Sequence, residues 1–347
     1  MKKVYVGMSG GVDSSVTAAL LLKQGYDVTG VYMKNWSKDI PGFECPWKED
    51  YQDAKRVAVH LGIPFKLYDF ETEYRQRVVD YMVEGYKAGR TPNPDIMCNQ
   101  EIKFRLFLDT ALEDGADIIA TGHYARIKDG RLYTGIDGNK DQSYFLYRVT
   151  ESALKHSLMP IGEYEKPKVR EQARKFGLST AEKKDSQGIC FVGKVGIKEF
   201  LLHELGEQLN GAIVDQHGKI IGEHDGALFY TIGQRHGLSV GGGLPYYVIG
   251  KDMAKNEVYV TTDLQDEKLW SDNLTLQDVH WIHGEPSPSG IYAVRTRYRA
   301  PLVPVSGLSN KSGLWNLRLG EDVRAITPGQ SAVLYDGDMV LGGGIVI

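Results

Sequence analysis

The start of the chain restricts the fold most, because a short strand pattern runs through a glycine turn directly into a helix pattern. Residues 2–8 (KKVYVGM) are typical of a buried strand, and residues 14–24 (SSVTAALLLKQ) of a helix that ends at Gly25. Strand and helix patterns then alternate as far as residues 116–123 (ADIIATGH). This alternation predicts a parallel sheet covered by helices on both sides, which binds ligands at the carboxyl ends of its strands.

The rest of the chain changes character with distance from the N-terminus. Residues 125–137 (ARIKDGRLYTGID) are typical of a hairpin, and residues 166–177 and 197–205 of helices. After about residue 207, short alternating strands are separated by glycines, which favours a small β domain followed by a barrel. We therefore predict an α/β protein with a parallel-sheet nucleotide domain, a small β-containing central domain and a C-terminal β-barrel. The predicted boundaries are 1–206, 207–268 and 269–347, with a linker near residues 263–273.

Composition narrows the class of protein. The 347 residues are 42% hydrophobic and 25% charged, with no run close to the roughly 18 apolar residues of a membrane span. The first apolar stretch is too short for a signal peptide, so we expect a cytoplasmic protein without a membrane partner. Three cysteines without a CxxC pair favour neither a disulfide framework nor a zinc site. The net charge of −4 argues against a broadly basic surface but leaves room for a local basic patch.

The turn SGGVDSS after the first strand indicates an anion site. Gly10 and Gly11 let the backbone approach a ligand, and the helix start offers unpaired amides at the positive end of its dipole. Ser9, Ser14 and Ser15 can add hydroxyl donors. The alternative is a plain strand–helix turn capped by serines. The stretch lacks the lysine of a Walker loop and departs from the dinucleotide pattern GxGxxG.

Two of the three cysteines lie in unusual surroundings. Residues 91–100 (TPNPDIMCNQ) contain two prolines, so we expect a loop there, and Cys98 on such a loop is either a chemical group or a small apolar core residue. Cys190, in KKDSQGICFVG (183–193), lies between Ile189 and Phe191 and is either a buried structural thiol or a reactive one. For Cys45 we expect structure or indifference.

An arginine row is predicted near the C-terminus. In residues 294–301 (VRTRYRAP), the strand period of two places Arg295, Arg297 and Arg299 on one face, beside Tyr298. Such a row suits the phosphates and bases of RNA. The alternative is a solvated strand face.

Several motifs together resemble known families. SGGxDS resembles the PP-loop of the ATP pyrophosphatases, which cleave ATP between its α- and β-phosphates. The ordered set across the whole chain resembles the bacterial tRNA 2-thiouridylase family: GMSGGVDSS, TPNPDIMCN, TGHYAR, KDQSYFL, DSQGICF, YTIGQRHGL, RYRAP and PGQ (328–330).

The resemblance implies a reaction. ATP, with Mg²⁺ alongside, would adenylate the C2 oxygen of the wobble uridine at position 34 of tRNA, and sulfur would then displace AMP. A persulfide on Cys190 would carry the sulfur, because a terminal persulfide sulfur ionises more readily than a thiol. Cys98 would release hydrosulfide or form a transient Cys98–Cys190 disulfide, and Asp95 would act as general acid or base. A turn aspartate is the alternative for Asp95.

The same resemblance implies the binding residues and partners. The ATP site would comprise Gly7, Met8, Ser9, Gly10, Gly11, Val12, Asp13, Ser14, Met33 and Gly122. The tRNA contacts would be Asn93, Pro94 and Asp95 at the flipped-out base, together with His123, Lys140, Asp141, Gln142, Arg297, Tyr298 and Gln330. His123 could equally be a satisfied strand-end histidine. The implied partners are tRNAs for Lys, Glu and Gln, and a sulfur donor that is a cysteine desulfurase or a relay protein.

Two rival functions remain open at this level. Another PP-loop enzyme, such as an amidating synthetase, needs an ammonia source and leaves both cysteine motifs without a role. A non-catalytic tRNA-binding or nucleotide-sensing module predicts tRNA binding without pyrophosphate release.

Overall fold

The computed structural model describes residues 1–39, 44–184, 196–238, 240–241 and 243–347. The N-terminal part is built on a five-stranded sheet in the order β3-β2-β1-β4-β7, and every neighbouring pair is parallel. Its strands are β1 (Lys3–Gly7), β2 (Asp27–Lys34), β3 (Phe65–Asp69), β4 (Ile118–Ala120) and β7 (Ser157–Leu158). Successive crossovers go outward from β1 in one direction and then from β4 in the other. The loops after β1 and β4 therefore meet at the carboxyl edge of the sheet, where such folds bind ligands.

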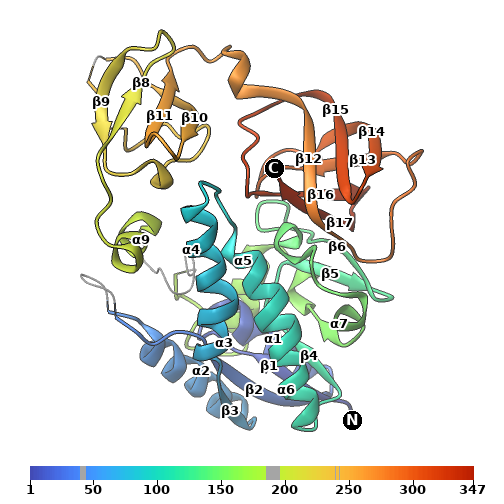
Figure 1. Ribbon diagram of the computed structural model, residues 1–347. Helices are drawn as coiled ribbons and strands as arrows, with labels where there is room; N and C mark the ends of the chain where they lie inside the picture. The colour runs from blue at the N-terminus through green and yellow to red at the C-terminus, as the bar shows by residue number, and fades with distance from the viewer. Residues whose placement is uncertain (40–43, 185–195, 239, 242) are drawn as a thin grey trace.

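Helices cover both faces of this sheet (Figure 1). Alternate strand residues explain the two layers, because Val4 and Val6 face one core and Tyr5 faces the other. The first core contains residues of α1 (Val12–Lys23), α2 (Trp47–Leu61) and α8 (Lys166–Lys175). The second contains residues of the helical run α3 (Glu71–Tyr74), η1 (Arg75–Val79) and α4 (Asp80–Lys87), and of the run α5 (Pro94–Met97), η2 (Cys98–Leu106) and α6 (Phe107–Glu113).

The segment predicted as a loop, residues 91–100, is helical from Pro94 onward, so that prediction is wrong. Pro94 occupies the first turn of α5, where a missing amide hydrogen costs no helical hydrogen bond. The Asn93 side chain caps the helix by accepting hydrogen bonds from the amides of Asp95 (3.1 Å) and Ile96 (3.4 Å). Prolines that exclude a helix interior are thus compatible with a helix start.

A small β domain follows α9 (Ile197–Leu205). Its four-stranded sheet has the order β10-β11-β8-β9, with β8 (Gly211–Val214) parallel to β11 (Glu257–Thr261) and the other pairs antiparallel. The outer strands are β9 (Ile220–His224) and β10 (Tyr247–Asp252). The strand β12 (Trp270–Trp281) begins inside the predicted linker.

The C-terminal part is a closed barrel of six antiparallel strands, which confirms the predicted fold class together with the parallel sheet. The order β12-β15-β14-β13-β16-β17 closes because β12 also pairs with β17. The strands after β12 are β13 (Tyr292–Arg295), β14 (Val303–Lys311), β15 (Leu314–Arg324), β16 (Ser331–Asp336) and β17 (Met339–Val346). Their inward residues, including Trp315 and Leu317, form a separate core.

A hairpin from the N-terminal part extends this barrel. The predicted hairpin is present as β5 (Ala125–Lys128) and β6 (Arg131–Thr134), and β6 pairs with β17 through Tyr133 and Met339. The amide of Thr134 also donates to the carbonyl of Asp338 at 2.8 Å. The barrel is therefore attached to the nucleotide domain by sheet pairing across about 200 residues of chain.

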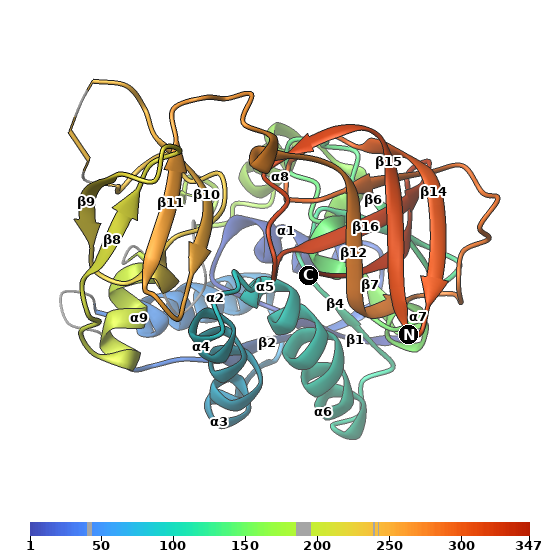
Figure 2. The ribbon, with the colours of Figure 1, turned by 45° about the horizontal axis from the view of Figure 1, so that its top comes forward.

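The central sheet and the barrel lie on either side of α4 and α5 (Figures 1 and 2). None of the described helices is both long and apolar enough to cross a membrane. The boundaries at residues 206 and 268 stay predictions.

Candidate functional site

The loop after β1 has the geometry of an anion site. The cap residue of α1, Gly11, has no side chain to occupy the first amides of the helix, which leaves them directed at the loop. The Ser14 hydroxyl accepts from the amide of Ser9 at 3.1 Å and donates to the carbonyl of Gly11 at 3.3 Å, so it braces the turn. At Gly10, where φ is +75°, a Cβ would lie 2.3 Å from the carbonyl oxygen of Asp50. Only glycine fits this position, as the loop prediction requires.

The other predicted ATP-site residues lie around this loop. A Cβ on Gly7 would lie 2.9 Å from Cε of Met33, so the Met33 side chain covers the start of the loop. A Cβ on Gly122, after β4, would lie 2.8 Å from the amide nitrogen of Ser14. The segment after β4 therefore approaches the first turn of α1 backbone to backbone, and the structure brings Met33 and Gly122 together with the loop from far apart in sequence.

A lysine that the sequence analysis missed lies at this site. Both carboxylate oxygens of Asp13 are 2.8 Å from Nζ of Lys166, and Oδ1 also accepts from the hydroxyl of Tyr124 at 2.8 Å. Lys166 is buried, with its ammonium 5.6 Å from the centre of the Tyr124 ring. The loop has no lysine of its own, and a distant helix places one beside it. No local pattern in residues 166–177 distinguishes this lysine from its exposed neighbours.

The predicted base-contact residues stand at the start of α5. Pro94 is buried, while Asn93 and Asp95 are half-buried. Burial raises the pKa of the Asp95 carboxyl, and the nearby Lys103 ammonium opposes that rise. Cys98 follows one turn later and is buried among core residues at 3% exposure. Asp95 and Cys98 thus share one rigid helical segment.

His123 is buried beside the same helix. Its Nδ1 shares a hydrogen bond of 2.8 Å with the Thr121 hydroxyl, and its Nε2 lies 3.5 Å from Nζ of Lys103. Burial and the lysine charge hold the pKa of His123 well below its ordinary value, so the ring is neutral at pH 7. The histidine therefore offers hydrogen bonding without a charge.

The residues 140–142 build the connection to the barrel. The buried Asp141 accepts from the amides of Gly135 (3.0 Å) and Ser143 (3.1 Å), from the Ser143 hydroxyl (3.0 Å) and from Nη1 of Arg295 (2.9 Å). Gln142 Oε1 accepts from the amide of Tyr124 at 3.0 Å. These side chains shape the segment from within, and Lys140 precedes them at half-buried exposure.

The prediction of an arginine row on one strand face is wrong, because β13 ends at Arg295. Arg295 turns inward to Asp141, and Arg299 has a left-handed backbone with φ of +63°. Arg297 lies between them, and its Nη2 donates to the carbonyl of Ile232 at 3.0 Å, to the carbonyl of Ala325 at 2.6 Å and to the Thr327 hydroxyl. The turn that follows Arg295 breaks the period of two, so the three arginine side chains do not share one face.

Arg297 and Gln330 instead belong to a joint between the three parts of the chain. The carbonyl of Thr91 accepts from Nε2 of Gln330 at 3.0 Å, and the amide of Thr91 donates to the carbonyl of Pro328 at 3.0 Å. Its hydroxyl shares a bond of 3.1 Å with that of Thr231 in the central domain. Thr91 is two residues before Asn93, so the joint lies directly beside the predicted base site. The ring of Tyr298 packs against that of Phe145 at a tilt of 46°, with ring centres 4.5 Å apart.

The remaining cysteines have separate positions. Cys45 is half-buried and its thiol lies 3.6 Å from the carbonyl oxygen of Trp36, so its setting is structural. Cys190 lies outside the described residues. Lys183, close before that segment, pairs with Asp50 (2.8 Å) and Asp53 (2.6 Å), and Asp50 is the residue that packs against Gly10. Lys183 therefore lies close to the nucleotide loop.

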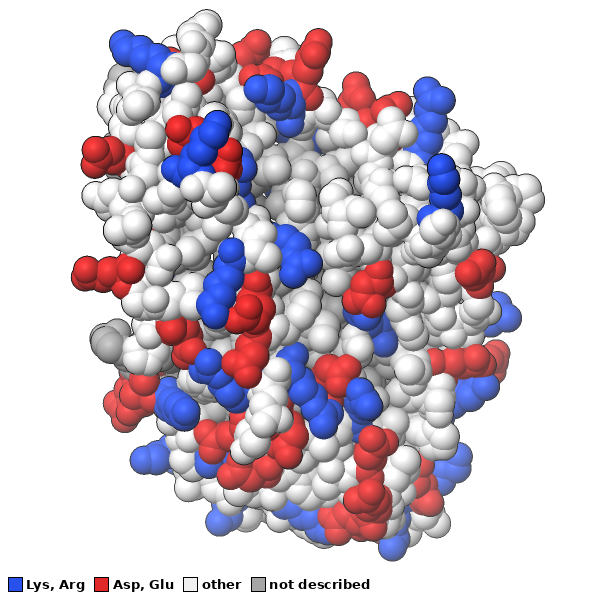
Figure 3. All heavy atoms as spheres, viewed as in Figure 1, with Lys and Arg blue, Asp and Glu red and all other residues white. Residues whose placement is uncertain are grey.

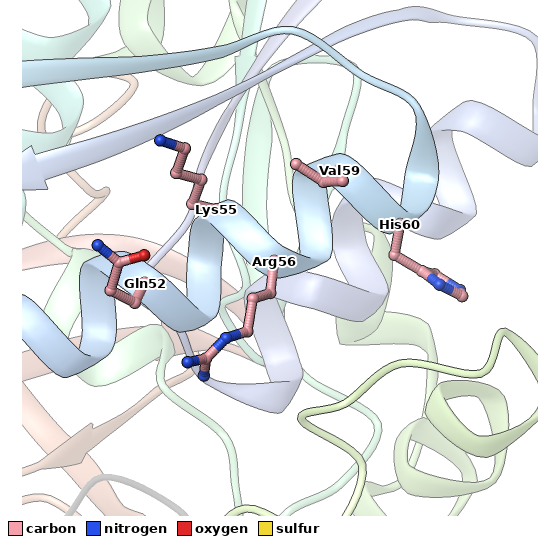
Figure 4. A pocket seen from close by; sticks show the side chains of 5 residues that line it. All are labelled: Gln52, Lys55, Arg56, Val59 and His60. Atoms are coloured by element: carbon pink, nitrogen blue, oxygen red, sulfur yellow. The ribbon is translucent and has the colours of Figure 1, made fainter.

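The surface of α2 carries a pocket, and the face in Figure 3 carries charges of both signs. A shallow pocket on α2 is lined by side chains of that helix alone, which point in different directions (Figure 4): Gln52, Lys55, Arg56, Val59 and His60. On the face shown in Figure 3, Lys and Arg are interspersed with Asp and Glu, without a continuous basic band. In the part of the chain that the structure describes, no group of three or more His, Cys, Asp or Glu is placed to hold a metal.

The fold and the loop define a class: a nucleotide-binding α/β protein with an anion loop at its sheet edge, extended by two β domains. Family models match all three parts, by their descriptions the tRNA methyl transferase HUP domain (residues 2–194), the tRNA methyl transferase PRC-barrel domain (198–262) and the aminomethyltransferase beta-barrel domain (271–346).

The similar curated proteins carry a more specific name. The tRNA-specific 2-thiouridylase MnmA of Methylobacillus flagellatus is 47% identical over 99% of this chain and 98% of its own. The protein of that name from Listeria monocytogenes serotype 4a is 47% identical over 99% and 94%, and that from Enterococcus faecalis 46% over 99% and 95%. The chain belongs to the tRNA-specific 2-thiouridylase family, whose members are sulfurtransferase enzymes.

Proposed function

We propose that this protein uses ATP to replace the C2 oxygen of a tRNA wobble uridine, position 34, with sulfur. The observation that carries the proposal is full-length similarity: relatives named tRNA-specific 2-thiouridylase are 47% identical over 99% of the chain. The geometry agrees, since the anion loop and the predicted base segment are linked through the contact between Lys103 and His123. The two matched models described as methyl transferase domains suggest a different chemistry, but methyl transfer leaves Cys98 and Cys190 without a role.

ATP would bind with its phosphates on the loop and the first amides of α1, and with its adenosine near Met33 and Gly122. The oxygen ligands that Mg²⁺ prefers are available as the carboxylate of Asp13 and the exposed hydroxyl of Ser9. A bound magnesium would neutralise charge on the departing pyrophosphate. Lys166 and Tyr124 hold the Asp13 carboxylate in one orientation before the nucleotide arrives. These residues fit a magnesium–nucleotide complex in which phosphate oxygens supply the remaining ligands.

The tRNA would present its flipped-out uridine to Asn93, Pro94 and Asp95. His123, the residues 140–142, Tyr298 and Gln330 would contact the tRNA around it. Arg297 would contribute through Nη1 and Nε, because the three protein bonds described above all use Nη2. The expected acceptors are tRNAs for Lys, Glu and Gln.

Sulfur would arrive as a persulfide on Cys190, loaded by a cysteine desulfurase or a relay protein. Lys183, the last residue but one that the structure describes before the segment of Cys190, pairs with Asp50 and Asp53 of α2. Cys98 would release the sulfur as hydrosulfide or resolve the product as a Cys98–Cys190 disulfide. As a half-buried acid with a raised pKa, Asp95 suits proton transfer at the base.

The test separates the two half-reactions. Cys190→Ser keeps nearly the same volume but cannot form a persulfide, so it should bind ATP and tRNA and release pyrophosphate without making 2-thiouridine. Asp13→Ala should impair pyrophosphate release itself. Nucleoside mass spectrometry after incubation with tRNA, ATP, magnesium, free cysteine and a cysteine desulfurase distinguishes thiolation from methylation. Production of 2-thiouridine by Cys190→Ser at the wild-type rate would refute the persulfide assignment, and its absence with the wild-type protein would refute the function.

A further inference from the structure

Three polar side chains recur at four-residue spacing on the helix that begins at Pro94: Asp95, Asn99 and Lys103. This spacing places them on one side of the helix. Asn99 is buried at 3% exposure, and its Nδ2 donates to the carbonyl of Phe145 at 3.1 Å. Its Oδ1 has no hydrogen-bond partner among the described atoms. A polar row therefore runs through a largely apolar layer, starting at the predicted base segment.

Lys103 is at the far end of this row. Its ammonium lies 3.5 Å from Nε2 of the neutral His123, and its charge reaches the Asp95 carboxyl, where it opposes the effect of burial. Within the described part of the chain, no carboxylate approaches its ammonium to within the 4.0 Å of an ion pair. Its neighbour Arg105, on the same helix, is by contrast exposed and paired with Glu101 at 2.9 Å. A half-buried cation held by an imidazole rather than a carboxylate keeps its charge available for an anion.

The position of Lys103 limits which anion can bind to its ammonium. His123 directly follows Gly122, whose backbone meets the amide of Ser14 in the nucleotide loop. Lys103 is thus next to the phosphate loop on one side and shares a helix with Asp95 on the other. In an adenylation, the phosphorus atom that joins the base to the nucleotide must lie between these two places, and that atom belongs to the α-phosphate.

We propose that Lys103 is a catalytic residue of the adenylation step, whose ammonium contacts a non-bridging oxygen of the ATP α-phosphate. This assignment rests on the proposed function. In the step, O2 of the uracil forms a bond to the α-phosphorus, and the bond from that phosphorus to the bridging oxygen breaks with its electron pair leaving on pyrophosphate. The N3 proton of the uracil passes to the Asp95 carboxylate. The cation offsets the negative charge on the α-phosphoryl oxygens while the bond to O2 forms and the bond to the bridging oxygen breaks.

The experiment compares Lys103→Gln and Lys103→Arg with the matched control Arg105→Gln. The affinities for tRNA and for ATP are measured separately from the rate of single-turnover pyrophosphate release, and circular dichroism checks that the variants are folded. We expect Lys103→Gln to slow release about 10²- to 10³-fold, with the affinity for tRNA changed less than about 3-fold. Lys103→Arg should recover part of the rate, and Arg105→Gln should match the wild type.

A stereochemical probe distinguishes contact from a structural role. The two diastereomers of ATP with sulfur at the α-phosphate should show a rate ratio in the wild type that changes in Lys103→Gln, because the ammonium touches one of the two oxygens. An unchanged ratio, or a release rate within about 3-fold of wild type, would overturn the assignment. Failure of the wild-type protein to release pyrophosphate with tRNA would instead refute the proposed function, and this assignment with it.

Discussion

Asp141 offers the sharpest test of how the nucleotide domain is attached to the barrel. Its carboxylate is 3% exposed and accepts four hydrogen bonds, from two amides, one hydroxyl and Arg295. Asp141→Ala leaves the Arg295 charge, with a side chain 15% exposed, without its carboxylate. Nε of Arg295 already has no partner among the described atoms, and the Tyr335 ring, with its centre 5.4 Å from the guanidinium carbon, remains as a weaker contact. Breaking one partner of a buried pair costs about 3–5 kcal/mol, and we expect a loss of that size.

Urea denaturation followed by near-ultraviolet circular dichroism measures this loss in the barrel. The rings of Trp281 and Trp315 lie 4.9 Å apart in its core and report on its packing. Asp338→Ala is the matched control, because Asp338 pairs with Arg126 across the same interface but is 57% exposed. The control should lose only about 0–1 kcal/mol.

A double variant identifies the cause. Arg295→Met removes the cation that Asp141→Ala leaves unpaired, so Asp141→Ala/Arg295→Met should be more stable than the sum of the two single losses predicts, by about 2 kcal/mol. Strictly additive losses, or a loss below about 1 kcal/mol for Asp141→Ala, would refute the reasoning that the buried ion pair joins the two domains.

Three further predictions concern the site. Burial raises the pKa of the Asp95 carboxyl in the folded protein above its value in the unfolded chain. The protonated carboxyl therefore stabilises the fold below the unfolded pKa, and this stabilisation is lost as the pH rises through the folded pKa. Asp95→Asn should therefore lose less stability than wild type between pH 4 and 7 in urea denaturation, while pyrophosphate release falls; equal losses would contradict the burial argument. Gly122→Ala places a Cβ 2.8 Å from the Ser14 amide nitrogen, and calorimetry should show ATP affinity at least about 10-fold weaker with tRNA affinity unchanged. Arg297→Ala should weaken tRNA binding and reduce the slope of log affinity against log salt by about 0.7–0.9 for each phosphate that the variant no longer neutralises. An unchanged slope would mean that Arg297 serves only the joint.

The nucleotide loop was predictable because its signals are local. A strand, a glycine turn and a helix follow one another within residues 2–24, and each dictates its own geometry. The helical start at Pro94 was missed although its signals are also local. The Asn–Pro pair is typical of a capped helix start, but two prolines in ten residues favoured a loop.

Other features arise only through tertiary structure. Lys166 and Lys103 look like ordinary surface lysines in sequence, and only folding places them beside Asp13 and His123. The period of two could not show that β13 ends at Arg295 or that this arginine turns to the buried Asp141, 154 positions earlier in the chain. The partners lie 153 positions away for Lys166, 154 for Arg295 and 20 for Lys103, so none of these pairs leaves a local pattern in the sequence.

The pairing of the β5–β6 hairpin with β17 has a consequence for synthesis on the ribosome. Tyr133 cannot pair with Met339 until the ribosome has added about 200 further residues. At about 5–20 residues per second this takes about 10–40 s, during which the hairpin has an unpaired edge. An isolated hairpin is marginally stable in water. The nascent nucleotide domain therefore has an unpaired strand edge at β6. Chains that end before β17 can pair with one another through this edge.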